Sequence, residues 1–189
     1  MIRVGIVGDI GSGKSYVAKK FGYPVFNADL VVNNLYKNNI PCFKKLNKLY
    51  PNNIISFPIV KKEITNNILQ NKSSLKKIIE IIHPLVRNRM NKFITKNKNK
   101  KIIVLDIPLL LENKINKKND VIVFVESKKN KILNKLKKRN NFNLKLIKKF
   151  KKIQLPLEYK KKKSQFIVRN NFNNKFLKKD INRILKEIL

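Results

Sequence analysis

A glycine-rich segment near the amino terminus constrains the fold more than any other feature. Residues 8–15 are GDIGSGKS and match the pattern G-x-x-x-x-G-K-[S/T]. An apolar run at residues 2–7 precedes this segment, and a helical stretch at residues 14–21 follows it. A strand, a glycine-rich turn and a helix in this order begin a parallel α/β unit whose turn surrounds phosphate groups. The sequence therefore predicts an α/β fold of the P-loop NTPase type.

The groups in this segment suit a nucleoside triphosphate with its metal ion. Glycines let consecutive backbone N–H groups turn toward phosphate oxygens, and the following helix adds the positive end of its dipole. Lys14 is expected to reach the β- and γ-phosphates, and the Ser15 hydroxyl to bind Mg²⁺. The predicted nucleotide-binding residues are Gly11, Ser12, Gly13, Lys14, Ser15 and Tyr16, with ATP and Mg²⁺ as the bound species. The alternative is a glycine-rich turn that holds no ligand.

Asp9 is an unusual residue for such a loop. Its carboxylate would repel a neighbouring triphosphate unless it points away from the phosphates or contacts the shell of the metal ion. We favour the orientation in which the side chain points away.

Four further apolar runs predict the remaining strands. They lie at residues 23–26, 101–107, 120–125 and 165–168, and the second and third have the short, β-branched character of central parallel strands. Residues 28–98 carry apolar side chains three and four positions apart, which predicts helices and no strand. We expect this block to be a helical insertion at the carboxyl edge of the sheet, where open α/β sheets bind ligands. Other helices are expected at 127–138, at 142–163 with a break at Pro156, and from the last strand to residue 189.

Two of the chain's 11 acidic residues, one after and one at the end of a predicted strand, lie where a phosphotransferase needs carboxylates. Asp29 comes after the second strand, and two roles fit it: a base that accepts the proton of an attacking hydroxyl, or the N-cap of a helix beginning at Leu30. Asp106 directly follows the apolar residues 102–105 and ends that strand. It is expected to orient Mg²⁺ in the Walker B manner, and the alternative is a simple turn residue at the end of a strand.

Three basic or titratable side chains are candidates for contacts with the substrate. His83 precedes Pro84, a residue suited to the first turn of a helix, so His83 is expected either to cap or pack against that helix or to bind substrate. Arg87 is a candidate for a bidentate contact with a substrate phosphate, although most surface arginines have no such role. Arg139 ends a predicted helix where the lids of small kinases begin, and it is expected to close over the transferring phosphoryl group.

The formal net charge of +34 suggests a phosphate-rich partner when taken alone. Only six of the 45 basic residues are arginine, and the lysines are spread along the chain together with many Asn and Ile. This distribution indicates a drift in composition across the whole chain rather than a binding stripe. We therefore expect no specific nucleic-acid partner.

The single cysteine, Cys42, excludes an internal disulfide and fits a reducing cytoplasm. The first residues predict a strand and not a signal peptide, and no apolar run approaches the length of a membrane helix. The expectation is a cytoplasmic protein without a membrane association, acting as a monomer or weak homo-oligomer.

Taken in order, these segments resemble the dephospho-CoA kinase family over nearly the whole chain. Residues 8–15 are similar to its G-G-I-G-S-G-K-S with Asp9 in place of a glycine, and residues 27–29 (NAD) are similar to its D-A-D with Asn27 in place of the first aspartate. The other matching segments are 83–87 (HPLVR; H-P-x-V-R), 106–112 (DIPLLLE; D-x-P-L-L-F-E), 154–156 (QLP; Q-x-P) and 168–171 (VRNN; V-I-x-N-N). Residues 165–166 (QF) depart from the usual A-D.

The resemblance implies transfer of the ATP γ-phosphate to the ribose 3′-hydroxyl of dephospho-CoA, the last step of coenzyme A biosynthesis. It implies that Asp29 is the base, that Arg139 is the lid arginine, and that His83 and Arg87 lie in the helical domain on the CoA side. It also implies the strand order 2-3-1-4-5. The expected organisation is a single P-loop kinase domain with a three-layer core at about 1–28 and 100–189, a helical insertion at about 29–99 and a lid at about 139–163.

Two other functions remain open from the sequence. One is a different small-molecule kinase, such as a nucleoside monophosphate kinase, although the segment at residues 106–112 argues against it. The other is a basic RNA- or DNA-binding protein with a P-loop ATP site. That function predicts arginine and aromatic residues clustered on one face, whereas this chain has diffuse lysine.

Overall fold

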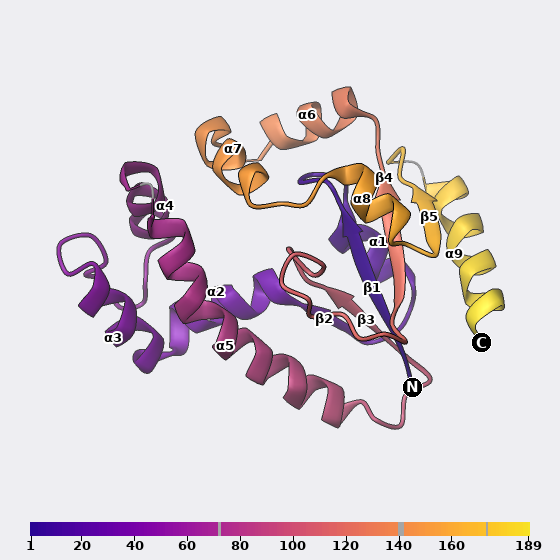
Figure 1. The fold of residues 1–189 in the computed structure, drawn as a ribbon, viewed down its shortest axis with the longest axis horizontal. Coiled ribbons are helices and arrows are strands. Elements are labelled where there is room, and N and C mark those ends of the chain that lie inside the picture. The colour runs from indigo at the N-terminus through magenta and orange to yellow at the C-terminus, as the bar shows by residue number, and fades with distance from the viewer. Residues whose placement is uncertain (72, 140–141, 173) are drawn as a thin grey trace. The chain divides into compact units, whose positions relative to one another are not determined.

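The computed structural model describes residues 1–71, 73–139, 142–172 and 174–189. Within it the chain forms two compact units, one of residues 1–27 and 96–189 and the other of residues 28–95. Figure 1 shows the elements of both units along the chain.

The first unit is built on a five-stranded parallel sheet in the order β2-β3-β1-β4-β5. Its strands are β1 (Ile2–Gly8), β2 (Val25–Asn27), β3 (Ile102–Asp106), β4 (Val121–Glu126) and β5 (Phe166–Arg169). All five predicted strands are confirmed, as is the predicted order. The first strand lies in the middle, with Val4 opposite Val104 on one side and opposite Val121 on the other. The loop that follows β1 is therefore carried by the most enclosed strand of the sheet.

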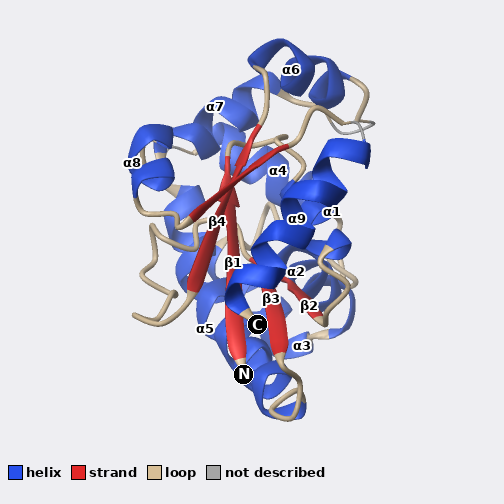
Figure 2. Ribbon diagram, turned by 90° about the vertical axis from the view of Figure 1, so that its right-hand side faces the viewer, coloured by secondary structure: helices blue, strands red, loops and turns tan. Residues whose placement is uncertain are grey.

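Helices α1 (Lys14–Lys20) and α9 (Asn174–Ile188) lie on one side of this sheet, and α8 (Leu157–Lys162) lies on the other (Figure 2). The core beneath α1 and α9 consists of alternate residues of the strands together with apolar residues of both helices. Its buried members include Val4, Ile6, Val17, Phe21, Val104, Val123, Val168, Leu177 and Ile181. Helices on both faces of a parallel sheet explain why its strands are apolar on both sides, and they confirm the predicted α/β class.

The opposite face of the sheet contains a buried ion pair. Arg3 on β1 lies 2.9 Å from Asp120, and both side chains are buried. Burial raises the pKa of the Asp120 carboxyl, while the backbone N–H of Lys117 and the Arg3 guanidinium act in the opposite direction. The guanidinium also contacts the Ile115 carbonyl oxygen. The pair thus joins the start of β1 to the segment that leads into β4.

Helices α6 (Lys129–Lys137) and α7 (Leu144–Lys152) complete the first unit. The predicted helical segment at 142–163 forms α7 and α8, which are separated around Pro156 as expected. None of the described helices is long and apolar enough to cross a membrane.

The second unit is helical, as predicted for this block, and its described residues form no strand. It contains α2 (Ala28–Asn38), α3 (Ile40–Leu49), α4 (Lys61–Gln70) and α5 (Ser74–Lys96). The prediction that Pro84 occupies the first turn of a helix is wrong, because α5 begins at Ser74 and continues through Pro84. Its buried stripe includes Ile78, Ile82 and Val86, on both sides of the proline. This packing offsets the proline's missing hydrogen bond.

Candidate active site

The loop between β1 and α1 has a backbone that only glycine adopts readily. Gly8, Gly11 and Gly13 have φ values of 148°, 85° and 89°. Gly13 stands at the N-cap of α1, where no side chain caps the helix and the first turn has no acidic residue. No carboxylate in the first turn of α1 therefore offsets the positive end of the helix dipole, which favours an anion there.

Two residues from the ends of β4 and β5 brace this loop. The side-chain amide of Asn170 donates to the Ser12 carbonyl oxygen at 2.8 Å, and a Cβ on Gly13 would overlap that amide. The Ser127 hydroxyl lies 2.9 Å from the carbonyl oxygens of Ser12 and Asn170. Sequence reasoning did not identify Ser127, because a serine after a strand has no distinguishing pattern, whereas Asn170 belongs to the segment VRNN.

The hydroxyl of Ser12 is fully buried and has no hydrogen-bond partner among the described residues. Buried polar atoms nearly always have a partner, so this orphan hydroxyl marks a hydrogen bond that the loop itself does not supply. This observation fits a phosphate group and argues against a loop that holds no ligand.

The side chain of Lys14 contacts the backbone at the start of the loop. Its ammonium nitrogen donates to the Asp9 carbonyl oxygen at 2.8 Å and to the Gly8 carbonyl oxygen at 3.3 Å. Both carbonyl oxygens are neutral acceptors, and a phosphate would be a stronger acceptor for this charge.

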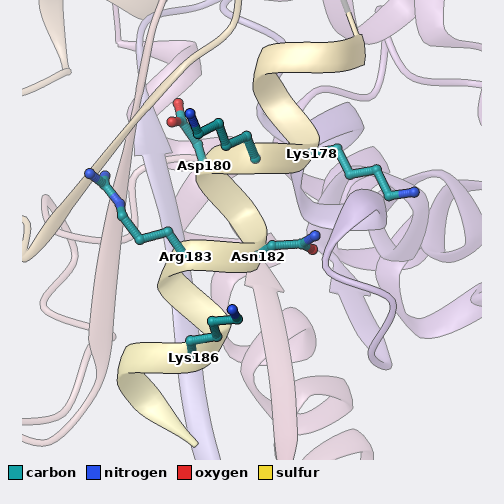
Figure 3. A pocket seen from close by; sticks show the side chains of 6 residues that line it. Lys178, Asp180, Asn182, Arg183 and Lys186 are labelled. Carbon is teal, nitrogen blue, oxygen red and sulfur yellow. The ribbon is translucent and has the colours of Figure 1, made fainter.

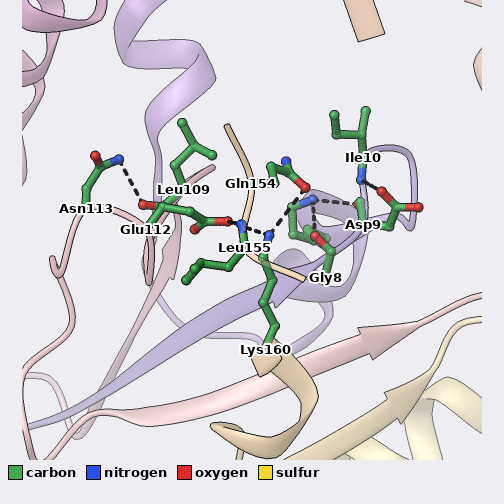
Figure 4. A network of polar contacts seen from close by, with 10 residues as sticks. Gly8, Asp9, Ile10, Leu109, Glu112, Asn113, Gln154, Leu155 and Lys160 are labelled. Atoms are coloured by element: carbon green, nitrogen blue, oxygen red, sulfur yellow. Dashed lines mark hydrogen bonds and ion pairs between the residues drawn. The ribbon is translucent and has the colours of Figure 1, made fainter. Parts of the chain in front are cut away.

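The Asp9 carboxylate is directed toward the backbone amide of Ile10, which donates to Oδ1 at 2.7 Å (Figure 4). Its other oxygen, Oδ2, lies 3.6 Å from Nζ of Lys151 on α7. The charge of Asp9 is thus paired within the first unit.

Asn27 at the end of β2 lies beside both predicted metal ligands, Ser15 on α1 and Asp106 at the end of β3. Asn27 pairs with Asp106 in the sheet, and its side-chain amide donates to Asp106 Oδ2 at 2.5 Å. The same amide nitrogen lies 3.5 Å from the Ser15 hydroxyl. The Asp106 side chain is buried. Asn27 therefore links the two residues predicted to bind Mg²⁺, a contact that sequence reasoning did not foresee.

No group of three or more His, Cys, Asp or Glu side chains that suits a metal ion occurs among the described residues. A carboxylate and a hydroxyl nevertheless match how Mg²⁺ is bound in phosphotransferases, where phosphates and waters supply the other ligands. The donor set of Ser15 and Asp106 therefore fits that ion.

Two further segments of the predicted pattern meet beside the loop (Figure 4). Nζ of Lys160 lies 2.7 Å from Glu112 and 3.3 Å from the Gln154 side-chain oxygen. The backbone amide of Leu155 also donates to Glu112, at 3.1 Å. We call these residues the Glu112 cluster. The cluster fixes the chain after α7 to the segment after β3. Lys160 could not be identified from the sequence, because the stretch around it contains many lysines.

Two other predicted residues of the first unit are exposed. Tyr16 lies on the first turn of α1, with the Lys20 ammonium 5.3 Å from its ring centroid. Arg139 follows α6, and its backbone carbonyl accepts from Phe142 at 3.0 Å.

The remaining predicted residues belong to the helical unit. Asp29 is exposed in the first turn of α2, and because α2 begins at Ala28, the expectation that Asp29 caps a helix starting at Leu30 is wrong. His83 lies inside α5, so it is not a helix cap either. His83 and Arg87 are four residues apart and share a face of that helix. Burial, and secondarily Arg87, lowers the pKa of His83, which favours the neutral imidazole.

A separate basic surface lies on α9 (Figure 3). Its lining residues are Lys178, Lys179, Asp180, Asn182, Arg183 and Lys186. Labelled side chains diverge around the helix, with Lys178 and Asn182 on one side and Arg183 on the other. Since none of the lining residues is aromatic, the surface lacks the stacking platforms of single-strand binders. It does not favour the nucleic-acid hypothesis.

The sheet order, with a G-x-x-x-x-G-K-S loop between its central strand and α1, defines a P-loop kinase fold. The chain belongs to the dephospho-CoA kinase family, whose model matches residues 2–175.

Three similar proteins illustrate this relationship. The chain is 34% identical over 129 residues to "Dephospho-CoA kinase" of Bartonella quintana, with 66% of each protein covered. It is 31% identical over 127 residues to "Dephospho-CoA kinase" of Wolbachia sp. subsp. Brugia malayi, with 65% of each covered. The chain thus spans about two thirds of the length of these relatives. The crystal structure of TT1252 from Thermus thermophilus has the same fold, with a TM-score of 0.76, 24% identity, and coverage of 99% of this chain and 95% of that one.

Proposed function

We propose that the chain transfers the γ-phosphoryl group of ATP to the ribose 3′-hydroxyl of dephospho-CoA, the last step of coenzyme A biosynthesis. The observation that carries this proposal is the convergence of Lys14, Ser15 and Asp106 at the carboxyl end of one sheet. Membership of a family described as dephospho-CoA kinase supplies the acceptor.

In this proposal the loop holds the triphosphate. Gly11, Gly13 and the amides at the start of α1 surround the phosphate oxygens, and the orphan hydroxyl of Ser12 gains a partner. Lys14 leaves the carbonyl oxygens of Gly8 and Asp9 and contacts the β- and γ-phosphates. Such a fixed set of positive groups stabilises the charge that builds on the γ-phosphoryl oxygens in the transition state.

Ser15 and Asp106 are the proposed ligands for Mg²⁺. When bound, the ion neutralises charge on the phosphates. Asn27 holds the Asp106 carboxylate through its amide, and because an amide is neutral, it adds no negative charge beside the phosphates. The carboxylate is thereby oriented before the substrates arrive.

The helical unit supplies the groups for the acceptor. Asp29 accepts the proton of the 3′-hydroxyl as that oxygen bonds to the γ-phosphorus, while the bond from phosphorus to the bridging oxygen breaks and ADP leaves. Arg87 pairs with a phosphate of the acceptor, and the neutral imidazole of His83 makes a hydrogen bond to it.

Arg139 is proposed to close over the transferring phosphoryl group from a lid at about 139–163. Its exposed position after α6 leaves it able to move toward the nucleotide. We place the enzyme in the cytoplasm, acting as a monomer or weak homo-oligomer without a specific nucleic-acid partner.

The test is ATP consumption with Mg²⁺ and each of three acceptors: dephospho-CoA, AMP and adenosine. We expect turnover with dephospho-CoA alone. Asp29→Asn should lower kcat by about 100-fold or more, because the proton loses its acceptor, and should leave ATP affinity unchanged. Glu158→Gln is the matched control, since Glu158 is also an exposed acid in the first turn of a helix. Turnover with AMP instead would identify another kinase, and ATP binding without turnover on any acceptor would refute the proposal.

A further inference from the structure

The phosphate loop carries a negative charge of its own. Asp9 is followed by the glycines that surround the predicted phosphate site, and only 14% of its side chain is exposed. A carboxylate so poorly solvated would repel a triphosphate over a few ångströms. A loop with this residue needs a compensating cation if it is to bind ATP well.

Lys151 is that cation in the structure. Its ammonium nitrogen lies 3.6 Å from Asp9 Oδ2, while Asp9 Oδ1 is held by the amide of Ile10 at 2.7 Å. The two oxygens therefore have separate partners. The amide fixes the direction of the carboxylate, and the lysine balances its charge.

The helix that carries Lys151 is capped at its start and fixed at its end. Asn143 caps its start by accepting from the amide of Leu146 at 2.9 Å. The Glu112 cluster fixes the chain just after it, through the amide of Leu155. Ile147 and Phe150 on the helix are half-buried. Lys151 therefore reaches Asp9 from a regular helix whose carboxyl end is fixed, which distinguishes it from a lysine on a free loop.

We infer that Lys151 is a positioning residue for ATP: it neutralises Asp9 and so keeps the phosphate loop attractive to a triphosphate. The inference rests on the proposed function, because it takes the loop to be the ATP site. With the Asp9 charge balanced, Lys14 and the loop amides face the phosphates without an opposing carboxylate. Lys151 acts through Asp9 and does not itself contact the nucleotide.

This indirect action makes a double-mutant cycle the decisive measurement. Lys151→Met should weaken ATP binding about three- to fivefold at low ionic strength, the size expected for a partly exposed ion pair. Asp9→Asn retains an acceptor for the Ile10 amide and removes the charge. In that background Lys151→Met should change the Kd by less than about 1.5-fold, because nothing remains to neutralise.

The cycle is measured as the Kd of ATP·Mg²⁺ by titration calorimetry, in low salt and again in high salt, where the coupling should shrink. Lys152→Met is the matched control, since Lys152 is the next residue on α7, is exposed, and makes no ion pair with Asp9 in the described part of the chain. Lys151→Arg should retain the wild-type Kd. Lys14→Ala tests the proposed function separately and should nearly abolish binding.

Two results would overturn the inference while leaving the proposed function intact. In the first, Lys151→Met binds ATP as Lys152→Met does, and Lys151 then has no special role. In the second, the loss persists in full with Asp9→Asn, and Lys151 then contacts the nucleotide directly. If wild type fails to bind ATP, or Lys14→Ala binds it normally, the proposed function itself fails.

Discussion

In the loop between β1 and α1, the groups that would face a ligand belong largely to the backbone. In the helical unit they are single side chains on helices, such as Asp29 and Arg87. The loop needs particular φ values and is braced by residues far away in sequence, including Asn170. The helices need only an apolar stripe to form. A site made from backbone therefore tolerates little change, whereas a site made from side chains can change one residue at a time.

The largest effect should come from adding one methyl group to the loop. Gly13→Ala combines a φ of 89° with a Cβ that would overlap the Asn170 amide, so the loop must shift. We expect kcat/KM to fall by about 100-fold or more, because a small misplacement of phosphate groups has a large cost. The measurement is steady-state turnover together with the Kd of ATP.

Gly22→Ala is the matched control for that change. Gly22 also has a positive φ, of 74°, but an added Cβ would meet nothing within 4 Å among the described residues. It should cost about 1 kcal/mol of stability from backbone strain and leave ATP binding unchanged. If both substitutions impair turnover equally, backbone strain rather than the contact with Asn170 controls the loop.

How far the sequence predicts this molecule depends on how local each signal is. The strands were predictable because each is a short apolar run, and the loop because its glycines and Lys14 are neighbours in the chain. Contacts such as Ser127 with Ser12 join residues far apart and leave no periodic pattern. The ion pair of Lys160 with Glu112 could not be predicted, because many neighbouring lysines look alike in the sequence. The α5 helix continues through Pro84, against expectation, because its buried stripe continues on both sides of the proline.

A smaller effect, on the free energy of unfolding, should distinguish two ion pairs made by neighbouring lysines of α8. Lys160 and Glu112 are 4% and 9% exposed, whereas Lys161 and Glu126 are 37% and 38% exposed. Glu112→Gln should lower the free energy of unfolding by about 2 kcal/mol, because Lys160 is left buried without its counter-charge. The check is urea unfolding of the purified variants.

Glu126→Gln is the exposed counterpart and should cost less, although the Lys161 ammonium lowers the pKa of Glu126. Water replaces much of what that exposed pair supplies. An equal loss in the two variants would mean that the Glu112 cluster is not the anchor that the structure indicates.

The smallest expected effect is on the pH dependence of stability in the helical unit, and it depends on His83, the chain's only histidine. Burial, and then Arg87, lowers the pKa of His83 from its ordinary 6.5. The unfolded chain therefore binds this proton more tightly than the folded protein does. The neutral imidazole therefore contributes stability that is fully present above the pKa of His83 in the unfolded chain, about 6.5. This contribution is lost as the pH falls through the lower pKa of His83 in the folded protein.

A proton NMR titration of the single imidazole measures this pKa directly. Wild type should titrate below 6.5, and Arg87→Gln should move the midpoint upward by removing the neighbouring positive charge. Arg89→Gln is the control, because position 89 is six residues from His83 on α5 and so faces another side of the helix. A wild-type midpoint at or above 6.5 would contradict the lowered pKa, and one well above 7 would mean that the imidazole is charged near neutrality. The neutral hydrogen-bonding role proposed for His83 would then have to be replaced by a direct ionic contact with the acceptor's phosphate.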